Sequence, residues 1–592
     1  MGKKLREIKT IIKDYFNNGY SQRDNANMIT HVSGLLNWVT QEIMRETTLE
    51  AYGKIAPKAV KLHNNGALHI HDLWLSKYTP YCSGFNLQDI ILDGLFLAKR
   101  AGPAKRLDSI LNQLINFIVS ASQEIAGATA FSNFDTFLAP FIKKEDLSYK
   151  KVKQEIQSFF FNVNQPSRYG WQSVFLNLNV DIIPPKYLLD RAIIIGEELM
   201  PFTYEECKSQ MDLINRAICE MHIKGDYNRQ PFTFPIITVQ VGKNFDWQDP
   251  ICLEYMKLAA LRGQPYFLNT NVPYIDEESS LSMCCRLNIN YNDLKHHTGG
   301  IFTPGDATGS IGVVSLNMPR IGRIARNEEM IYERVDKLLD AARTQLIGKR
   351  LLVNESFKRG LLPTIAQHLK HGLERHFNTI GIVGMHDFCM NYFDPPLPIY
   401  NSTAQTLVRK ILSYIGKKLE EFQREDKMLY NLEQTPAERT AGRFAYYDNQ
   451  KFKGNTYIHI RNNGHLQYVN STHLPPEFDN LSKKIEVEGD FQSFFTGGSV
   501  CHLFMNEISN NEGLVKFVKK ICNNSDLGYF SITPTLTHCK KCKQVLIGNF
   551  PICPSCNDKT IIYSRITGYY TPVGAWNPSK QEEFYLRNQF KI

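Results

Sequence analysis

The sequence predicts an α/β fold, because amphipathic helical segments alternate with short strand candidates rich in β-branched residues. Helical spacing of apolar residues is found over 1–60, 107–130, 205–224, 331–346 and 403–423. The strand candidates are 232–241, 310–317, 456–461 and 465–469. A barrel is one arrangement of such a chain, and a small C-terminal module begins where cysteines become frequent, near residue 535.

Composition is that of a globular protein, with 43% hydrophobic and 21% charged residues in a chain of 592. No apolar run reaches the roughly 18 residues that cross a bilayer. The N-terminus "MGKKLREIKTIIKDYF" lacks the apolar core and cleavage site of a secretory signal, so we expect a cytoplasmic protein. The net charge of +9 is too dilute for a DNA-binding tract but suits a protein that handles nucleotides.

Two CxxC pairs near the C-terminus predict a structural zinc site. The four cysteines are Cys539, Cys542, Cys553 and Cys556. Each pair can place two thiolates on one ion, and the loop between the pairs allows tetrahedral geometry. Because protein ligands fill all four positions, the ion would be structural rather than catalytic.

Three further cysteines are candidates for chemistry. Cys284 and Cys285 are adjacent in "SMCCRLN", where core filling and a reactive thiol are both open, and Arg286 favours a thiolate. Cys82 lies in "HIHDLWLSKYTPYCSGFNL", beside His69, His71 and Asp72. A metal site of amidohydrolase type is an alternative for His69 and His71, but the later histidines lack clear strand context.

Two segments could bind phosphate. "FTGGS" gathers four small residues whose backbone N–H groups could approach an anion, although a lone motif of this kind more often forms a plain turn: Thr496, Gly497, Gly498 and Ser499. "NLEQTPAER" is typical of a helix start, with Thr435 as cap, Pro436 in the first turn and Glu438 three residues after the cap. The N-terminus of such a helix also suits phosphate.

The chain resembles the anaerobic (class III) ribonucleotide reductases, which are glycyl-radical enzymes. The resemblance rests on segments in family order over nearly the whole chain: "GALHIHDL", "YCSGFNL", "EIAGATAFSNFDTFLAPF", "FNVNQPSRYGWQ", "FTFPI", "SMCCRLN", "TGSIGVVSLNMPRI", "NLEQTPAE", "FTGGS", the CxxC pairs and "RITGYYTPVGAWNPSKQEEF". It implies a ten-stranded α/β barrel around a finger loop at about 280–290. The expected division is an N-terminal helical region at 1–60, the barrel at 61–530, a zinc module at 531–560, and a glycyl-radical loop and tail at 561–592.

The resemblance also implies catalytic roles. Gly568 in "RITGYY" matches the position of the stable radical. A radical on its Cα would be stabilised by delocalisation over the flanking peptide groups. Cys285 would become the thiyl radical that takes the 3′ hydrogen of a ribonucleotide, and Cys82 would supply reducing equivalents from the opposite face. Met283 and Asn317 match residues associated with formate as electron donor, whereas Cys284 favours a thioredoxin-like dithiol donor. "FTGGS" and "NLEQTPAE", including Ala437, become candidates for gripping the phosphates of a triphosphate substrate.

Partners follow from the same resemblance. A separate iron–sulfur activase that uses S-adenosylmethionine would install the radical, because this chain has no CxxxCxxC cluster. Deoxynucleotide and ATP effectors would act at the interface of a homodimer. No ATP-cone module fits before the first barrel motif near residue 66, so we expect no overall inhibition by dATP through a cone.

Two alternatives stay open from the residues alone. Another glycyl-radical enzyme, of formate-lyase type, shares the glycine and the finger cysteine but does not predict the zinc quartet. A zinc-ribbon nucleic-acid-binding protein without enzyme activity predicts a basic surface around the ribbon and salt-sensitive DNA binding.

Overall fold

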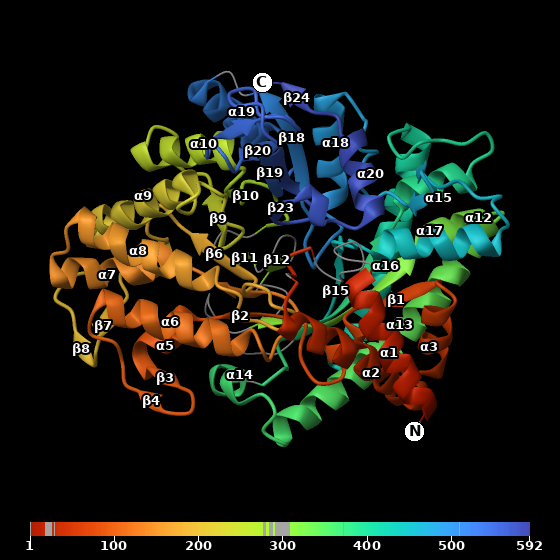
Figure 1. Cartoon of the computed structure of the whole chain (residues 1–592), viewed down its shortest axis with the longest axis horizontal. Coiled ribbons are helices and arrows are strands. Elements are labelled where there is room, and N and C mark those ends of the chain that lie inside the picture. Colours follow the sequence, from red (N-terminus) through yellow and green to blue (C-terminus); the bar gives the residue numbers. More distant parts are fainter. Residues whose placement is uncertain are drawn as a thin grey trace.

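A ring of strands surrounded by helices forms the centre of the molecule (Figure 1). The computed structural model describes residues 2–17, 26–28, 30–275, 280–282, 288–290, 308–370, 372–507 and 510–591. Mutually parallel neighbours make one half of the ring: β2 (Cys82–Phe85), β5 (Thr129–Phe131), β6 (Leu176–Val180), β9 (Ile236–Val241) and β10 (Tyr266–Asn269). The other half contains β13 (Thr308–Asn317), β14 (His376–Val383), β15 (Tyr430–Glu433), β18 (Cys501–Glu507) and β19 (Tyr529–Pro534).

The two halves join through antiparallel pairs, β2 with β13 and β10 with β19. The remaining gap, between β15 and the segment that leads into β18, is closed by backbone hydrogen bonds. Gly497 N–H donates to Leu432 O at 2.7 Å, and Gln434 N–H donates to Gly498 O at 3.0 Å. The ring therefore has no open edge here. The expectation of a ten-stranded α/β barrel is confirmed for the described residues, where ten of the twelve strands in this sheet belong to the ring.

Alternation along the strands separates a helix-facing core from the barrel interior. On β13, Val314 and Leu316 belong to an apolar core shared with helices, whereas Ser315 between them contacts polar side chains. On β14, Gly381 leaves room for the Thr435 side chain, because a Cβ at position 381 would lie 2.3 Å from it. Successive side chains of a strand point to opposite faces, so small inward residues leave room inside the ring.

Two large apolar cores pack helices against the two halves of the ring. One core includes α5 (Leu87–Asp93), α6 (Leu107–Ala121), α7 (Phe134–Glu145), α8 (Tyr149–Val163), α9 (Lys208–Lys224), α10 (Pro250–Arg262), α14 (Pro363–His368) and α19 (Asn511–Asn524). The other includes α2 (Val32–Ile55), α3 (Pro57–Asn64), α12 (Met318–Ile324), α13 (Glu328–Lys358), α15 (Met385–Tyr392), α16 (Ser402–Asp426) and α18 (Leu481–Gln492). Figure 1 shows these helices around the strands.

Several elements lie outside the ring. The strands expected at 456–461 and 465–469 form a separate hairpin, β16 (Ile460–Asn462) and β17 (His465–Gln467). The remaining elements are α1 (Gly2–Asn17), β1 (Leu68–Ile70), α4 (Leu73–Ser76), β3 (Leu95–Phe96), β4 (Arg100–Ala101), β7 (Ile194–Ile195), β8 (Glu198–Leu199) and α17 (Thr440–Lys451). None of the helices in the described ranges is both long enough and apolar enough to cross a membrane.

The C-terminal residues form one small sheet and then return to the barrel. The sheet has the order β21 (Val545–Ile547), β20 (Leu536–Cys539), β22 (Thr560–Arg565) and β23 (Tyr570–Pro572). It spans the boundary expected at residue 560, so the cysteine-rich segment and the Gly568 hairpin share a sheet. After α20 (Pro578–Leu586), β24 (Phe590–Lys591) pairs with β18 of the ring.

Candidate functional site

A cavity of about 610 Å³ connects three of the segments that the sequence singled out. Residues 69–74 and Cys82 line it from one side, and 436–440 line it from another. Thr567 and Tyr569, the two neighbours of Gly568, complete the wall. The fold therefore brings the Cys82 thiol and the Gly568 bend to a common space, although they are far apart in sequence.

Gly568 lies in the bend between β22 and β23 and is buried. Its carbonyl oxygen accepts hydrogen bonds from the Tyr266 hydroxyl at 2.5 Å and from Arg565 Nη1 at 2.9 Å. The preceding carbonyl, that of Thr567, accepts from His502 Nε2 at 2.6 Å. Both peptide groups that flank the Gly568 Cα are thus held by buried side chains.

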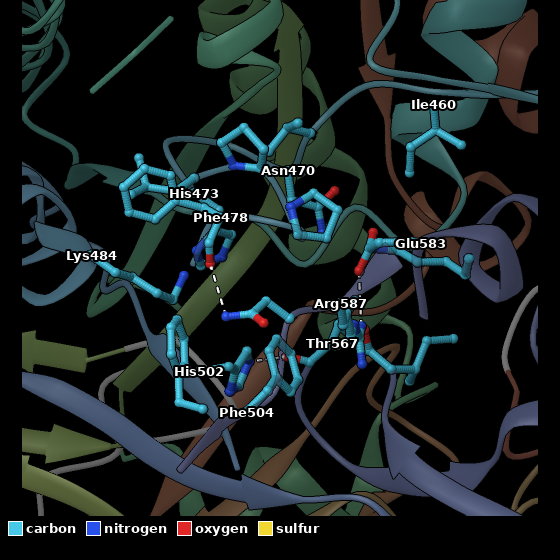
Figure 2. Close-up of a pocket in the computed structure, with 18 residues that line it drawn as sticks. Ile460, Asn470, His473, Phe478, Lys484, His502, Phe504, Thr567, Glu583 and Arg587 are labelled. Atoms are coloured by element: carbon cyan, nitrogen blue, oxygen red, sulfur yellow. Dashed lines mark hydrogen bonds and ion pairs between the residues drawn. The ribbon is translucent and has the colours of Figure 1, made fainter. Parts of the chain in front are cut away.

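A second, smaller cavity of about 60 Å³ lies beside the same bend (Figure 2). Figure 2 shows His502 directed toward Thr567, and Arg587 paired with Glu583. Arg587 also donates to the carbonyl oxygens of Arg565 at 2.8 Å and Ile566 at 3.3 Å. Arg587, which directly follows α20 and pairs with Glu583 of that helix, therefore fastens the start of the bend.

Cys82 begins strand β2 and is 2% exposed. Ala128 N–H approaches its Sγ at 3.2 Å, and Gly127 leaves room for the thiol, because a Cβ there would lie 2.5 Å from Sγ. The thiol is therefore fixed at the cavity wall.

Lys349 of α13 is a buried cation behind this wall, and no local sequence pattern predicted it. It occupies the space left by Gly312 on β13, where a Cβ would lie 2.9 Å from Nζ. Burial lowers the pKa of Lys349 to about 8, against the attraction of Asp72 and Cys82. A charge near the Cys82 thiol is a feature that the sequence reasoning missed, because a lysine within a long helix carries no distinctive local signal.

The histidines of "HIHD" are part of the cavity wall. Burial, with the nearby Lys349 and Arg443 charges, lowers the pKa of His71 to about 3, so the ring is neutral near pH 7. His71 Nε2 lies 2.9 Å from Ser315 Oγ on β13. Among the described residues, the cysteine quartet is the group arranged to hold a metal, and His69 and His71 are not in such a group.

The expected finger loop corresponds to the antiparallel hairpin β11 (Ser280–Ser282) and β12 (Asn288–Asn290). β11 lies against β6 of the ring. Met283, Cys284 and Cys285 lie outside the described residues.

"FTGGS" closes the barrel. Gly497 N–H donates to Leu432 O, and Gly498 N–H donates to Phe495 O at 2.9 Å. Thr496 Oγ1 accepts from Leu432 N–H at 3.2 Å, and Ser499 is buried. The two glycine N–H groups are therefore used within the chain, and phosphate contact by these four residues stays a prediction.

"NLEQTPAE" lines the cavity, but the helix start expected there is wrong. The helix α17 begins at Thr440, and the Thr435 hydroxyl lies 2.9 Å from Ser315 Oγ instead of capping the helix. Ala437 has a positive φ of 48°, which keeps 436–439 out of the helix. Ala437 and Glu438 both line the cavity.

Arginines gather at the start of α17. Arg45, Arg439 and Arg443 line the cavity together with Thr440 and Gly442. Arg443 donates through Nη2 to His63 O, and its buried Nη1 has no hydrogen-bond partner within the described part of the chain. The spacing of Arg439 and Arg443, one helical turn apart directly after "NLEQTPAE", could have revealed this cluster.

Asn317 lies at the end of β13 and caps α12, with its Oδ1 accepting from Arg320 N–H at 3.2 Å. Its Nδ2 donates to Gly66 O at 2.8 Å and to Asp448 Oδ2 at 2.9 Å. These contacts give Asn317 a structural role in this conformation, and its part in formate chemistry stays a prediction.

The four cysteines meet at one end of the C-terminal sheet. Their sulfur atoms all lie within 4.8 Å of one another, with Cys539 and Cys556 at 3.4 Å and Cys542 and Cys553 at 3.7 Å. Tetrahedral Zn–S bonds of ~2.3 Å require sulfurs ~3.8 Å apart. The donor set and its spacing fit structural zinc.

The chain is similar to known proteins in sequence and in fold. A family model described as anaerobic ribonucleoside-triphosphate reductase matches residues 24–590. The anaerobic ribonucleoside-triphosphate reductase of Haemophilus influenzae is 24% identical over 577 residues, which cover 89% of this chain and 78% of the relative. Thermotoga maritima anaerobic ribonucleotide reductase with glycerol in the active site has a TM-score of 0.77 at 20% identity, covering 98% of this chain and 94% of that one. Its complex with dATP and CTP has a TM-score of 0.74 at 21% identity, covering 98% and 96%.

Proposed function

The chain belongs to the anaerobic ribonucleoside-triphosphate reductases, and from that premise we propose how its residues reduce ribonucleotides to 2′-deoxyribonucleotides. The activity follows from a family match that spans residues 24–590. A formate-lyase relative and a non-enzymatic nucleic-acid-binding protein are not favoured by this match.

One observation carries the assignment of the site. Cys82 and the two neighbours of Gly568 line one cavity inside a closed barrel. A substrate in that cavity would contact a thiol on one side and the Gly568 bend on another. This supports Gly568 as the radical position and Cys82 as the reducing cysteine.

The proposed reaction begins with hydrogen-atom transfer. The Gly568 Cα radical takes the hydrogen atom from Cys285 S–H, which forms a C–H bond and leaves a thiyl radical. The thiyl radical takes the 3′ hydrogen of the ribonucleotide, and the 2′ hydroxyl takes a proton and leaves as water. The 3′ hydroxyl releases a proton and Cys82 gives a hydrogen atom to C2′, which leaves a ketone at C3′ and a thiyl radical on Cys82. The external two-electron donor returns a hydrogen atom to Cys82 and supplies one electron, which with a proton converts the ketone into a C3′ radical. Return of the 3′ hydrogen from Cys285 restores the thiyl radical.

The substrate phosphates would lie at the start of α17. The helix N-terminus attracts anions, and Arg45, Arg439 and Arg443 add positive charge there. Ala437 and Glu438 line the cavity beside this region. The Thr435 hydroxyl connects the same segment to Ser315 of β13. A triphosphate fits this charge better than a neutral ligand does.

Zinc at the four cysteines would stabilise the sheet that carries Gly568. When bound, the ion would cross-link the two CxxC pairs and would take no part in the reaction of the substrate. The chain's own residues, Tyr266, His502, Arg565 and Arg587, hold the bend on the barrel side.

Further partners are proposed from the family. A separate activase that uses S-adenosylmethionine would generate the radical. Deoxynucleotide effectors would act on a homodimer, in keeping with the Thermotoga maritima structure described as having dATP in the specificity site. Met283 and Asn317 favour formate as electron donor, whereas Cys284 favours a redoxin, and we infer the dithiol donor from the adjacent Cys284–Cys285 pair.

Oxygen cleavage tests the radical position. The protein is activated anaerobically with a verified activase and then exposed to air, which should cut the chain at Gly568 and release residues 569–592. Gly568→Ala should abolish both the cut and the electron paramagnetic resonance signal of the radical. An uncut, signal-free wild type would refute the assignment.

Single-donor turnover tests the electron source. Wild type and Cys284→Ser are assayed with formate alone and with a reduced thioredoxin-like protein alone. Redoxin-driven turnover that is lost in Cys284→Ser supports the dithiol donor. Redoxin-driven turnover that Cys284→Ser leaves intact, or turnover by formate alone, contradicts it.

A further inference from the structure

Four successive carbonyl oxygens in the Gly568 bend each accept a hydrogen bond from a side chain. Arg587 donates to the carbonyls of Arg565 and Ile566, and His502 donates to that of Thr567. The Gly568 carbonyl receives two donors, Tyr266 and Arg565. We call Tyr266, His502, Arg565 and Arg587 the carbonyl clamp.

The clamp is built from well-separated parts of the fold. Tyr266 begins β10, His502 lies in β18, Arg565 ends β22, and Arg587 follows α20. All four side chains are less than one-tenth exposed. Buried donors that converge on one bend in this way exceed what a simple surface turn needs, since a turn can leave its carbonyls to water.

The donors are themselves held in place. Tyr266 stacks on Tyr529, with ring centroids 5.1 Å apart. The Arg565 guanidinium lies 4.3 Å from the centroid of the Tyr266 ring and also donates to Gly263 O. His502 Nε2 carries the donating N–H, because its partner Thr567 O can only accept, and Nδ1 lies 2.8 Å from Ser531 Oγ. The clamp is therefore preorganised around Gly568.

We propose that Tyr266 and Arg565 are positioning residues that stabilise the glycyl radical by hydrogen bonding to the Gly568 carbonyl oxygen, an inference that rests on the proposed radical at Gly568. An unpaired electron on Cα is shared with the adjacent carbonyl, which places spin and partial negative charge on the oxygen. Donors at that oxygen lower the energy of this form, as they do for any developing negative charge. His502 and Arg587 keep the bend in the orientation that the two donors require.

The consequence is a bias in the hydrogen-atom exchange between Gly568 and Cys285. Stabilising the glycyl radical shifts the equilibrium toward the stored radical and away from the thiyl radical, without any additional reactant. Because the hydrogen bond is made in both forms, only the strength that it gains toward the more negative oxygen of the radical shifts the equilibrium, and we expect a shift of about five- to tenfold. The stored radical should then decay faster at rest.

The test compares Tyr266→Phe with Tyr529→Phe in the full-length, zinc-loaded protein. The hydroxyl of Tyr529 lies 3.0 Å from Thr238 Oγ1, so this variant removes a neighbouring phenol without touching the Gly568 carbonyl. Each activated protein is examined anaerobically by electron–nuclear double resonance in H₂O and D₂O. Radical lifetime and melting temperature are measured in parallel.

The wild-type radical should show exchangeable protons coupled to the carbonyl oxygen, and Tyr266→Phe should lose one of them and shorten the lifetime about five- to tenfold. Tyr529→Phe should keep both properties. A Tyr266→Phe radical with the wild-type proton couplings and lifetime would overturn the proposal. A wild type with no glycyl radical would overturn the proposed function as well.

A second variant covers the case in which Tyr266→Phe loses stability. A fluorotyrosine at position 266 keeps the ring and strengthens the O–H donor, so it should lengthen the radical lifetime. An unchanged lifetime and unchanged couplings with the fluorotyrosine would also overturn the proposal.

Discussion

The hydroxyl of Thr567 donates a 2.9 Å hydrogen bond to the Glu438 carboxylate. The bond joins the residue before Gly568 to the cavity segment that precedes α17. Asn577 strengthens the connection, because its side chain donates to Glu438 O at 3.1 Å. The Gly568 bend and the proposed substrate site are therefore mechanically linked.

Thr567→Val should lower kcat/KM about tenfold, because the near-isosteric side chain leaves the half-buried Glu438 carboxylate without this donor. Oxygen cleavage at Gly568 should persist, since the residue does not carry the radical. Thr571→Val, in the neighbouring strand β23, is the matched control and should retain turnover. Loss of cleavage in Thr567→Val would show instead that the bend itself had collapsed.

Cys82→Ala should abolish deoxynucleotide formation while leaving radical formation intact, because Cys82 acts after the first hydrogen transfer. Cys522→Ala, at another buried cysteine, is the control for lost thiol volume. Product is measured by chromatography and the radical by its resonance signal. Substantial turnover by Cys82→Ala would remove this cysteine from the mechanism.

Arg443→Met should raise the KM for a ribonucleoside triphosphate about 10- to 100-fold, as expected for the loss of a charged hydrogen bond to phosphate. The effect on kcat should be smaller. Lys451→Met, at the exposed C-terminal end of α17, is the control for net charge. Equal KM values in the two variants would place the phosphates elsewhere.

Zinc removal should unfold the C-terminal sheet before the barrel, because metal-binding energy in such a site is folding energy. Cys556→Ser should lose zinc, lower the first thermal transition and reduce the yield of radical at Gly568. Zinc content is measured by elemental analysis and unfolding by calorimetry. A zinc-free protein with normal radical yield would show that the zinc-binding module is not needed to hold Gly568 in place.

Acid should destabilise the fold partly through Glu583. Burial would raise its pKa, but the charges of Lys580 and Arg587 lower the pKa of Glu583 to about 2, from an ordinary 4.5. Because the unfolded chain binds the proton more tightly, the contribution to stability is complete above pH 4.5 and is lost as pH falls toward 2.

We expect the wild type to lose about 3 kcal/mol of unfolding free energy from this group over that interval. Glu583→Gln should start less stable and show a flatter decline in melting temperature below pH 4.5. Glu582→Gln, whose carboxylate accepts from Asn462 and Asn463, is the control on the same helix. Parallel declines in wild type and Glu583→Gln would contradict the assignment.

Local patterns predicted several helices, the ring strands β9 and β13, and the metal site, because these depend on short spacings. Alternating helices and strands indicated the α/β class, and two CxxC pairs placed four sulfurs that the fold brings together. The ten-stranded count came from the resemblance. Apolar periodicity does not reveal that Leu432 and Gly497 close the ring, since the two residues are distant in sequence.

The expected helix start and the expected phosphate loop also depend on contacts between residues that are distant in sequence. A threonine followed by proline and glutamate is a common helix start, yet Thr435 bonds to Ser315 of another strand and α17 begins later. Glycine spacing could not show that the N–H groups of Gly497 and Gly498 already have carbonyl partners. Lys349 reaches the wall behind Cys82 from the middle of a long helix, and its position depends on tertiary packing.

The hairpin with Gly568 comes after every strand of the ring in sequence, from β2 through β19. During synthesis, the barrel can therefore be complete while its interior still lacks the bend. An mRNA truncated between the codons for β19 and for Gly568 would yield a ring without a storage position for the unpaired electron. Premature termination would thus produce an inert protein rather than one that releases uncontrolled radicals.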